Sequence, residues 1–212
     1  MPHPTLTSTR FIADTNVAID FINNPAHARA NDFDYHQEDL LGHKCPIGSH
    51  VRRTNPRDSL EPGPGTERSV AINKKHRLLR RGRAYGPPVH PTLDPRAMMG
   101  EEDGRERGLH FICVNANITR QFEFVQQTWT NNPKFAGLYA DADPIVGDHD
   151  PHHEGQLGTF TIQGSPVRQR VCNIPRFVTT RGGAYFFLPS LTALRYLAAL
   201  HARVEAGTMV HA

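Results

Sequence analysis

The chain has 212 residues, a net charge of +3 at neutral pH and 38% hydrophobic residues. This length allows one domain with a sizeable core, and the nearly balanced charge without a reader motif argues against nucleic-acid binding. The three cysteines are far apart and form no CxxC pair, which argues against a disulfide scaffold or a structural zinc site and favours a reducing, cytoplasmic location. No apolar run approaches the roughly 20 residues that cross a bilayer, and the first residues do not have the pattern of a signal peptide, so no membrane association is expected.

Loop signals dominate the first third of the chain. Residues 1–30 hold one short apolar patch without a clear period, so we expect them to be poorly structured. Acidic residues and prolines predict loop over residues 31–64, where the stretch CPIGSHVRRTNPR sets one histidine ahead of three arginines. Residues 58–70 add a loop rich in proline and glycine. No regular element is therefore predicted before residue 70.

Two strands and a helix are predicted in the middle of the chain. The stretch HRLLRRGRAYG, residues 76–86, predicts a strand, and a loop rich in proline, glycine and acidic residues follows it. The stretch GLHFICVNAN, residues 108–117, is the strongest strand signal, and its apolar residues on both faces predict a strand buried on both. Asn117 is placed to cap a helix with an apolar stripe of Ile118, Phe122, Val125 and Trp129.

The last third combines further strands with a final helix. After a loop over residues 133–157, the stretch GTFTIQG predicts a short strand, and RFVTTRGGAYFFLP predicts a hairpin that turns at its glycine pair. Ser190 is placed to cap a helix that carries an apolar face of Leu191, Leu194 and Ala198. The order of strands and helices predicts an α+β fold with the helices on one face of the sheet.

Four of these stretches, in their order along the chain, resemble the C-terminal half of dye-decolourising (DyP-type) haem peroxidases. They are CPIGSHVRRTNPR, LLRRGRAYGPP, GLHFICVNANITRQFEFVQQTW and RFVTTRGGAYFFLPSLTALRYLA. The resemblance runs from about residue 31 to residue 200. It implies a ferredoxin-like antiparallel sheet with helices on one face, the C-terminal half of a dimeric α+β barrel-type peroxidase. It also implies a haem-binding domain over residues 31–205 and a tail over residues 206–212.

The resemblance assigns a role to each candidate site residue. It makes His50 the proximal ligand of a haem b iron, sets Arg80 over the distal face, and lets Leu109 and Phe111 line the distal pocket. A neutral imidazole is a good iron ligand when a carboxylate orients its other nitrogen, and Glu123 is our candidate for that acid. A guanidinium is always charged, so it can stabilise the anion that develops as peroxide breaks, but it cannot act as a base.

Each assignment has a simpler alternative. A lone histidine in a loop is usually a surface residue, and Glu123 could be a solvated helix glutamate. Arg80 could be one more solvent-facing arginine beside Arg77, Arg81 and Arg83, unless these pair with haem propionates. We favour the interpretation that the two arginine-rich stretches form two sides of a haem pocket.

The implied activity is the oxidation of dyes, phenols and other small aromatic reductants by hydrogen peroxide, and the family also allows a homo-oligomer. The family's GxxDG motif, which carries a distal aspartate, should precede His50. None of the 49 residues before His50 forms that motif. The chain therefore resembles a truncated member, and the alternative is a non-catalytic, haem-binding half-domain.

Two further motifs look functional but are interpreted otherwise. The stretch GEEDG, residues 100–104, matches GxxDG at Asp103, but it follows His50 inside a loop, so we interpret it as a coincidence. The stretch HDPHHEG, which begins at His149, offers several histidines and acids, but its spacing fits no standard zinc pattern. We expect it to bind metal only adventitiously.

Overall fold

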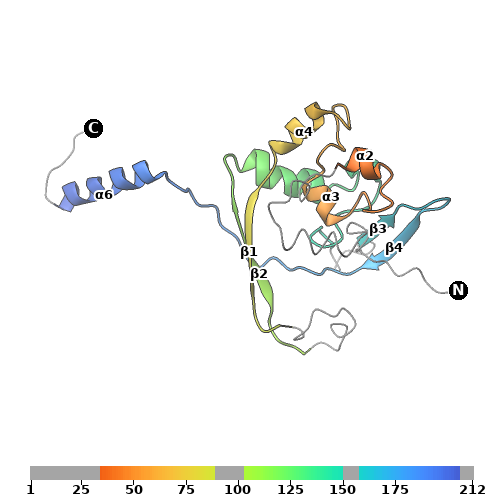
Figure 1. Cartoon of the computed structure of the whole chain (residues 1–212). Coiled ribbons are helices and arrows are strands. Elements are labelled where there is room, and N and C mark those ends of the chain that lie inside the picture. The colour runs from red at the N-terminus through yellow and green to blue at the C-terminus, as the bar shows by residue number, and fades with distance from the viewer. Residues whose placement is uncertain (1–33, 89–102, 150–157, 206–212) are drawn as a thin grey trace, which may run out of the picture. The chain divides into compact units, whose positions relative to one another are not determined.

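The structure is a computed structural model that describes residues 34–88, 103–149 and 158–205. The expectations for residues 1–30 and 206–212, and for the histidines of the HDPHHEG stretch after His149, lie outside these ranges. The chain divides after Val178 into two compact units, which are described separately. Figure 1 labels their elements.

Three short helices occupy the segment for which only loop was predicted, so that prediction was wrong. They are α2 (Tyr35–Asp39), α3 (His50–Thr54) and α4 (Glu67–Lys74). Polar caps start the last two of them: Ser49 Oγ accepts from the backbone N–H of Arg52, and Thr66 Oγ1 accepts from that of Ser69. Helices of five to eight residues are too short to show a hydrophobic period, and tertiary contacts supply most of their stability.

The two predicted central strands are confirmed and form an antiparallel ribbon. Strands β1 (Leu79–Tyr85) and β2 (Gly108–Val114) pair in continuous register from Leu79↔Val114 to Tyr85↔Gly108. Burial of β2 on both faces was a wrong prediction, because its apolar side chains are largely exposed. Apolar residues on both faces of a strand indicate that other elements could cover both faces. In the described part of the chain, however, β2 belongs to a two-stranded ribbon in which β1 is its only sheet neighbour.

The helical segment after β2 is confirmed, although its winding is π-helical. Asn117 Oδ1 accepts from the backbone N–H of Arg120 at 2.8 Å, so the predicted cap is present. Two π-helical pieces follow, η2 (Thr119–Glu123) and η3 (Val125–Thr130). Of the predicted stripe, Val125 and Trp129 are buried, and they form a core with Phe135 of the short 3₁₀ helix η4 (Phe135–Gly137).

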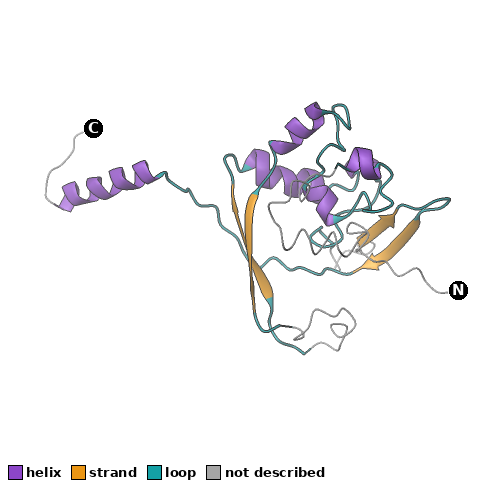
Figure 2. Ribbon diagram, in the orientation of Figure 1, coloured by secondary structure: helices purple, strands orange, loops and turns teal. Residues whose placement is uncertain are grey.

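A second antiparallel ribbon completes the first unit. Strand β3 (Gly158–Ile162) confirms the short strand predicted there, and its partner is β4 (Gln169–Ile174), which sequence reasoning missed. Figure 2 shows the strands of this unit as two separate pairs rather than one sheet. The α+β class with antiparallel pairing is confirmed, and the described strands divide between two ribbons.

The second unit holds the final helix. The hairpin predicted over residues 176–189 was wrong, because these residues contain no strand. Helix α6 (Leu191–Glu205) is confirmed together with its cap, since Ser190 Oγ accepts from the backbone N–H of Ala193 at 3.2 Å. The described helices include none that is long and apolar enough to cross a membrane.

Candidate functional site

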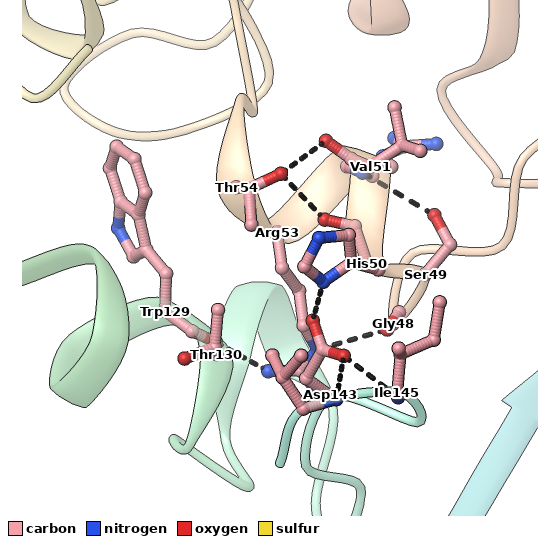
Figure 3. Close-up of polar contacts among 12 residues, drawn as sticks. Gly48, Ser49, His50, Val51, Arg53, Thr54, Trp129, Thr130, Asp143 and Ile145 are labelled. Carbon is pink, nitrogen blue, oxygen red and sulfur yellow. Dashed lines mark hydrogen bonds and ion pairs between the residues drawn. The ribbon is translucent and has the colours of Figure 1, made fainter. Parts of the chain in front are cut away.

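His50 is the first residue of α3, and its ring contacts a buried carboxylate. Its Nδ1 lies 2.9 Å from Oδ2 of Asp143, and Figure 3 shows the two side chains facing each other. The His50 side chain is 35% exposed, whereas that of Asp143 is fully buried. Asp143 therefore holds the ring at Nδ1, while part of the ring remains accessible to a ligand.

The Asp143 carboxylate is fixed by more than the histidine. Its Oδ1 accepts from the backbone N–H groups of Ile145 and Val146 at 2.9 and 3.0 Å, which closes a turn on the aspartate itself. Its own N–H donates to the carbonyl of Thr130 at the end of η3. Burial alone would raise the pKa of Asp143, but hydrogen bonds from His50 and from Val146 and Ile145 outweigh burial and lower that pKa.

This arrangement fixes the tautomer of His50. An ionised carboxylate can only accept hydrogen bonds, so His50 Nδ1 must be the donor of the 2.9 Å contact. In the neutral ring the lone pair then lies on Nε2. The structure thus presents a basic nitrogen whose orientation is set by Asp143.

A buried arginine next to the histidine joins the elements that carry this pair. The side chain of Arg53 is completely buried, and its guanidinium donates to the carbonyls of Gly48, Trp129, Asn132 and Asp141. Burial lowers the pKa of Arg53 to about 10, and the nearby carboxylates of Asp143 and Asp141 oppose that shift, so the group stays charged at neutral pH. Arg53 therefore links α3 to the end of η3, as Figure 3 shows for Trp129, and to the loop that precedes Asp143 through the carbonyl of Asp141.

Asp141 anchors the same loop to the second ribbon. Its carboxylate accepts from Thr159 Oγ1 at 2.7 Å and from the backbone N–H of Thr161 at 2.9 Å, both on β3. The segment from Asp141 to Asp143 is therefore held on one side by α3 and on the other by β3. Neither aspartate was selected from the sequence.

The other arginines of the CPIGSHVRRTNPR stretch also point into the fold. Arg52 donates to the carbonyls of Asp39 and Cys45 and lies over the ring of Tyr35, 4.6 Å from its centroid. Arg57 is buried as well. The Arg52 side chain thereby joins α3 to α2 and the loop that follows α2. The first arginine cluster consequently supports the histidine from within the protein, rather than forming an open side of a pocket.

Arg80, Leu109 and Phe111 lie together on one face of the β1–β2 ribbon. The register pairs Arg80 with Cys113, Gly82 with Phe111 and Ala84 with Leu109, and paired residues of an antiparallel ribbon share a face. Leu109 and Phe111 are 60% and 48% exposed. A Cβ on Gly82 would lie 3.1 Å from Leu109 Cδ1, so glycine makes room for that side chain.

The structure therefore yields two groups of candidate residues. His50 pairs with Asp143, and Arg80 shares an apolar face with Leu109 and Phe111. Among the described residues no hydrogen bond or ion pair joins the two groups. The distal-pocket role expected for the second group stays a prediction, and the sequence missed the partner of the histidine.

Glu123, our candidate for that partner, ends η2 and lines a shallow hollow with Gln126, Gln127 and Asn131. The carboxylate that orients His50 is Asp143 instead, so the expectation for Glu123 is corrected. Asp143 lies in a loop 93 positions after His50, and separation of that size leaves no local spacing to recognise. The one available signal is the Asp-Pro pair at Asp143, which favours an aspartate-closed turn.

The remaining acidic candidate has a local role. Asp103 forms a bidentate ion pair with Arg107, at 2.6 and 2.5 Å, and accepts from the backbone N–H of Arg105. The hydrogen bonds from Arg107 and Arg105 keep the pKa of this exposed carboxyl well below its usual range. That its resemblance to GxxDG is coincidental remains an interpretation. Within the described residues, no group of three histidine, cysteine or acidic side chains could hold a metal ion.

Comparison with known proteins relates the chain to a family. No family model matches the chain. The chain is 36% identical over 178 residues to the multifunctional dye peroxidase DyP2 of an Amycolatopsis species, which covers 81% of this chain and 36% of that protein. It is 31% identical over 175 residues to the dye-decolorizing peroxidase msp1 of Mycetinis scorodonius, covering 79% of this chain and 32% of the relative. The chain belongs to the dye-decolourising peroxidase family.

Solved structures of DyP-type peroxidases agree with this membership. The structure of DyP2 from Amycolatopsis matches the chain with a TM-score of 0.59. The match covers 78% of this chain and 35% of the DyP2 structure. A dye-decolorizing peroxidase in complex with cyanide matches 81% of the chain at 32% identity, with a TM-score of 0.59, over 35% of its own length. Another was solved with 2,6-dimethoxyphenol. The chain spans about a third of the length of the curated DyP-type relatives that it matches.

Proposed function

We propose that this chain holds a b-type haem through His50 and takes part in the peroxide-dependent oxidation of dyes and small phenolic compounds. The observation that supports this most directly is the 2.9 Å contact between His50 Nδ1 and the buried carboxylate of Asp143. Histidines that ligate metals generally donate their second ring N–H to a carboxylate or a carbonyl. A surface histidine with no such function has no need of a completely buried acid behind it.

The residues present fit a haem. With Nδ1 committed to Asp143, Nε2 of His50 is the nitrogen that would bind iron, and the partly exposed ring leaves it accessible. The negative charge of Asp143 makes the imidazole a stronger donor, because it stabilises the positive charge that ligation draws onto the ring. The apolar side chains of Leu109 and Phe111, exposed on the ribbon face, suit the flat hydrophobic surface of a porphyrin.

When bound, the haem supplies the redox chemistry that connects peroxide reduction with one-electron oxidation of a reductant. The chain contributes orientation and electrostatics. His50 would hold the iron, and Asp143 fixes the direction of the histidine ring. Arg80 supplies a permanent positive charge that stabilises the negative charge developing on the peroxide oxygens. Its guanidinium cannot move the peroxide proton, so that step needs another group.

The substrates that we propose are hydrogen peroxide and small aromatic reductants. A relative solved in complex with 2,6-dimethoxyphenol shows that a related fold accepts an electron-rich phenol. The 36% identity with a protein described as a multifunctional dye peroxidase extends the class to dyes. A cytoplasmic location and a homo-oligomeric state remain predictions from the sequence.

Haem titration followed by the Soret band tests the ligand directly. The full chain should bind haem and give the spectrum of a histidine-ligated iron, and His50→Ala should abolish that spectrum or weaken binding strongly. His43→Ala removes an exposed histidine of the same segment and is the matched control, which should bind as the wild type does. An unchanged histidine-ligated spectrum in His50→Ala would refute the assignment.

A second function, haem binding without turnover, is favoured by one observation. Among the described residues, none forms an ion pair with Arg80, so in this part of the chain no acid paired with Arg80 is available to transfer the peroxide proton. General acid–base groups typically contribute about 10²–10⁴-fold to a rate. Peroxide consumption by the haem-loaded chain separates the two functions. Turnover that depends on Arg80 supports the peroxidase, and a stable haem complex without turnover supports the binding role.

A further inference from the structure

The HDPHHEG stretch begins with a histidine that the proposed function does not use. His149 is only 2% exposed, and its Nε2 lies 2.9 Å from the backbone carbonyl oxygen of Asp143. A carbonyl oxygen only accepts hydrogen bonds, so Nε2 of His149 carries the proton and donates it. A buried histidine thus contacts the residue that orients His50.

The ring of His149 is held from several sides. A Cβ on Gly158, the first residue of β3, would lie 2.4 Å from His149 Nδ1, so the ring packs directly on the backbone there. The carbonyl of His149 accepts from Arg176 Nε at 3.0 Å, and Nη2 of the same arginine contacts Asp148 Oδ1 at 3.0 Å. His149 therefore cannot shift without moving β3 or the segment after β4.

The carbonyl that His149 contacts is the closing point of a short loop. Asp143 O also accepts from the backbone N–H of Gly147 at 2.9 Å, while Asp143 N–H donates to Thr130 O at 2.8 Å. Every polar group of Asp143, backbone and side chain, consequently has a partner. Two of the contacts to the Asp143 backbone come from residues outside its turn. Thr130, at the end of η3, accepts from its N–H, and His149, at the end of the loop, donates to its carbonyl.

We propose that His149 is a positioning residue that fixes Asp143, and through it the orientation of His50. The inference deepens the proposed function, on which the meaning of His50 as a ligand rests. The geometry consists of two contacts that meet at Asp143: His149 Nε2 donates to its backbone carbonyl, and its carboxylate accepts from His50 Nδ1. His149 touches neither the ligand nitrogen nor any reacting group, so its effect is expected on the geometry of the pair.

The same contact bears on metal binding by the HDPHHEG stretch. Nε2 of His149 is committed as a donor, and its Nδ1 faces the backbone at Gly158. A ring held in this way cannot turn its nitrogens to a cation in solution without leaving its site. The structure therefore gives this histidine an internal role.

NMR of the full chain labelled with ¹⁵N-histidine tests the contacts at Asp143 without haem. His50→Gln assigns the His50 signals, and the wild type should show a protonated Nδ1 with slow exchange of that proton. His149→Leu removes the donor. Exchange of the His50 Nδ1 proton should then accelerate about two- to tenfold, which is the factor by which the loss of one ordinary hydrogen bond changes an equilibrium constant. His149→Gln, which places an amide donor near the former Nε2, should restore much of the slow exchange.

The controls separate failure of this inference from failure of the proposed function. His43→Leu changes an exposed histidine and should leave the His50 signals unchanged. If His149→Leu remains folded and its His50 signals and exchange match the wild type, the positioning role is refuted. If His149→Leu does not fold, the folded His149→Gln variant decides. Slow exchange of the His50 Nδ1 proton in that variant supports the positioning role, and fast exchange refutes it. A chain that shows the contacts at Asp143 but binds no haem would instead overturn the proposed function alone.

Discussion

The guanidinium of Arg53 donates to the backbone carbonyl of Asp141, and this contact holds the helix of His50 against the loop of Asp143. The same guanidinium bonds three further carbonyls, so this side chain helps to set the distance between the two partners of the candidate site. The alignment of His50 with Asp143 is consequently a property of the fold around Arg53, and not of the two residues alone.

Replacement of Arg53 should therefore be among the most damaging single changes in this unit. Arg53→Met leaves four carbonyls without their donor, and we expect the free energy of unfolding to fall by about 3 kcal/mol or more. Urea unfolding followed by Trp129 fluorescence measures the change. Arg81→Met, at an exposed position of β1, is the control and should stay within about 0.5 kcal/mol of the wild type. Equal effects of the two substitutions would contradict the role of Arg53.

The lowered pKa of Asp143 predicts a pH dependence of stability. A carboxyl with a depressed folded-state pKa contributes stability that is present above its unfolded value, about 3.9, and is lost as pH falls through the folded value. The wild type should therefore lose stability below about pH 4 more steeply than Asp143→Asn, which has no charge to lose. Thermal unfolding of both proteins between pH 3 and pH 7, in steps of about half a unit, provides the measurement. Parallel curves would show that Asp143 is not the group responsible.

Arg80 and Arg81 offer a matched pair for testing the distal charge. The two residues are adjacent in β1 and both exposed, but the register places them on opposite faces, with Arg80 on the side of Leu109 and Phe111. Arg80→Leu should slow the reaction of haem-loaded protein with peroxide by about 10²–10³-fold, the typical cost of removing one preorganised donor. Arg81→Leu should leave the rate almost unchanged. Stopped-flow mixing with peroxide gives both rates, and equal losses would place the charge effect outside this face.

The close contact of His149 with Gly158 predicts a non-additive pair of substitutions. Gly158→Ala introduces a methyl group where the His149 ring lies, and we expect it to cost about 1–3 kcal/mol of stability. In a His149→Ala background the ring is gone, so the same substitution should cost much less. A double-mutant cycle of urea unfolding measures the coupling. Additive effects would mean that the ring does not fill this position in solution.

The sequence predicts most of the regular elements after residue 70, because strands and long helices carry periodic patterns. The strands at Leu79 and Gly108, the cap at Asn117 and the helix after Ser190 are all confirmed. The short helix that begins at His50 was missed, since five residues cannot show a period.

The apolar stretch after β4 was misread for a different reason. The glycine pair in RFVTTRGGAYFFLP permits a turn but does not require one, so the tertiary context decides whether a hairpin forms. The site shows the same limit. His50 and Arg80 could be chosen through motifs, whereas Asp143, Arg53 and His149 act through contacts that only the folded chain creates.

The distance along the chain between His50 and Asp143 also has a consequence for how the site arises during folding. The pair joins positions 93 residues apart, and the Arg53–Asp141 contact joins positions 88 apart. Contacts of such high sequence separation form late, because a long loop must close before they can contribute. During synthesis His50 therefore emerges as an ordinary imidazole whose ring rotates freely and whose proton exchanges between the two nitrogens. It becomes a selective ligand only after the segment around Asp143 has docked, so a ligand that recognises the oriented ring discriminates completed molecules from partly folded ones.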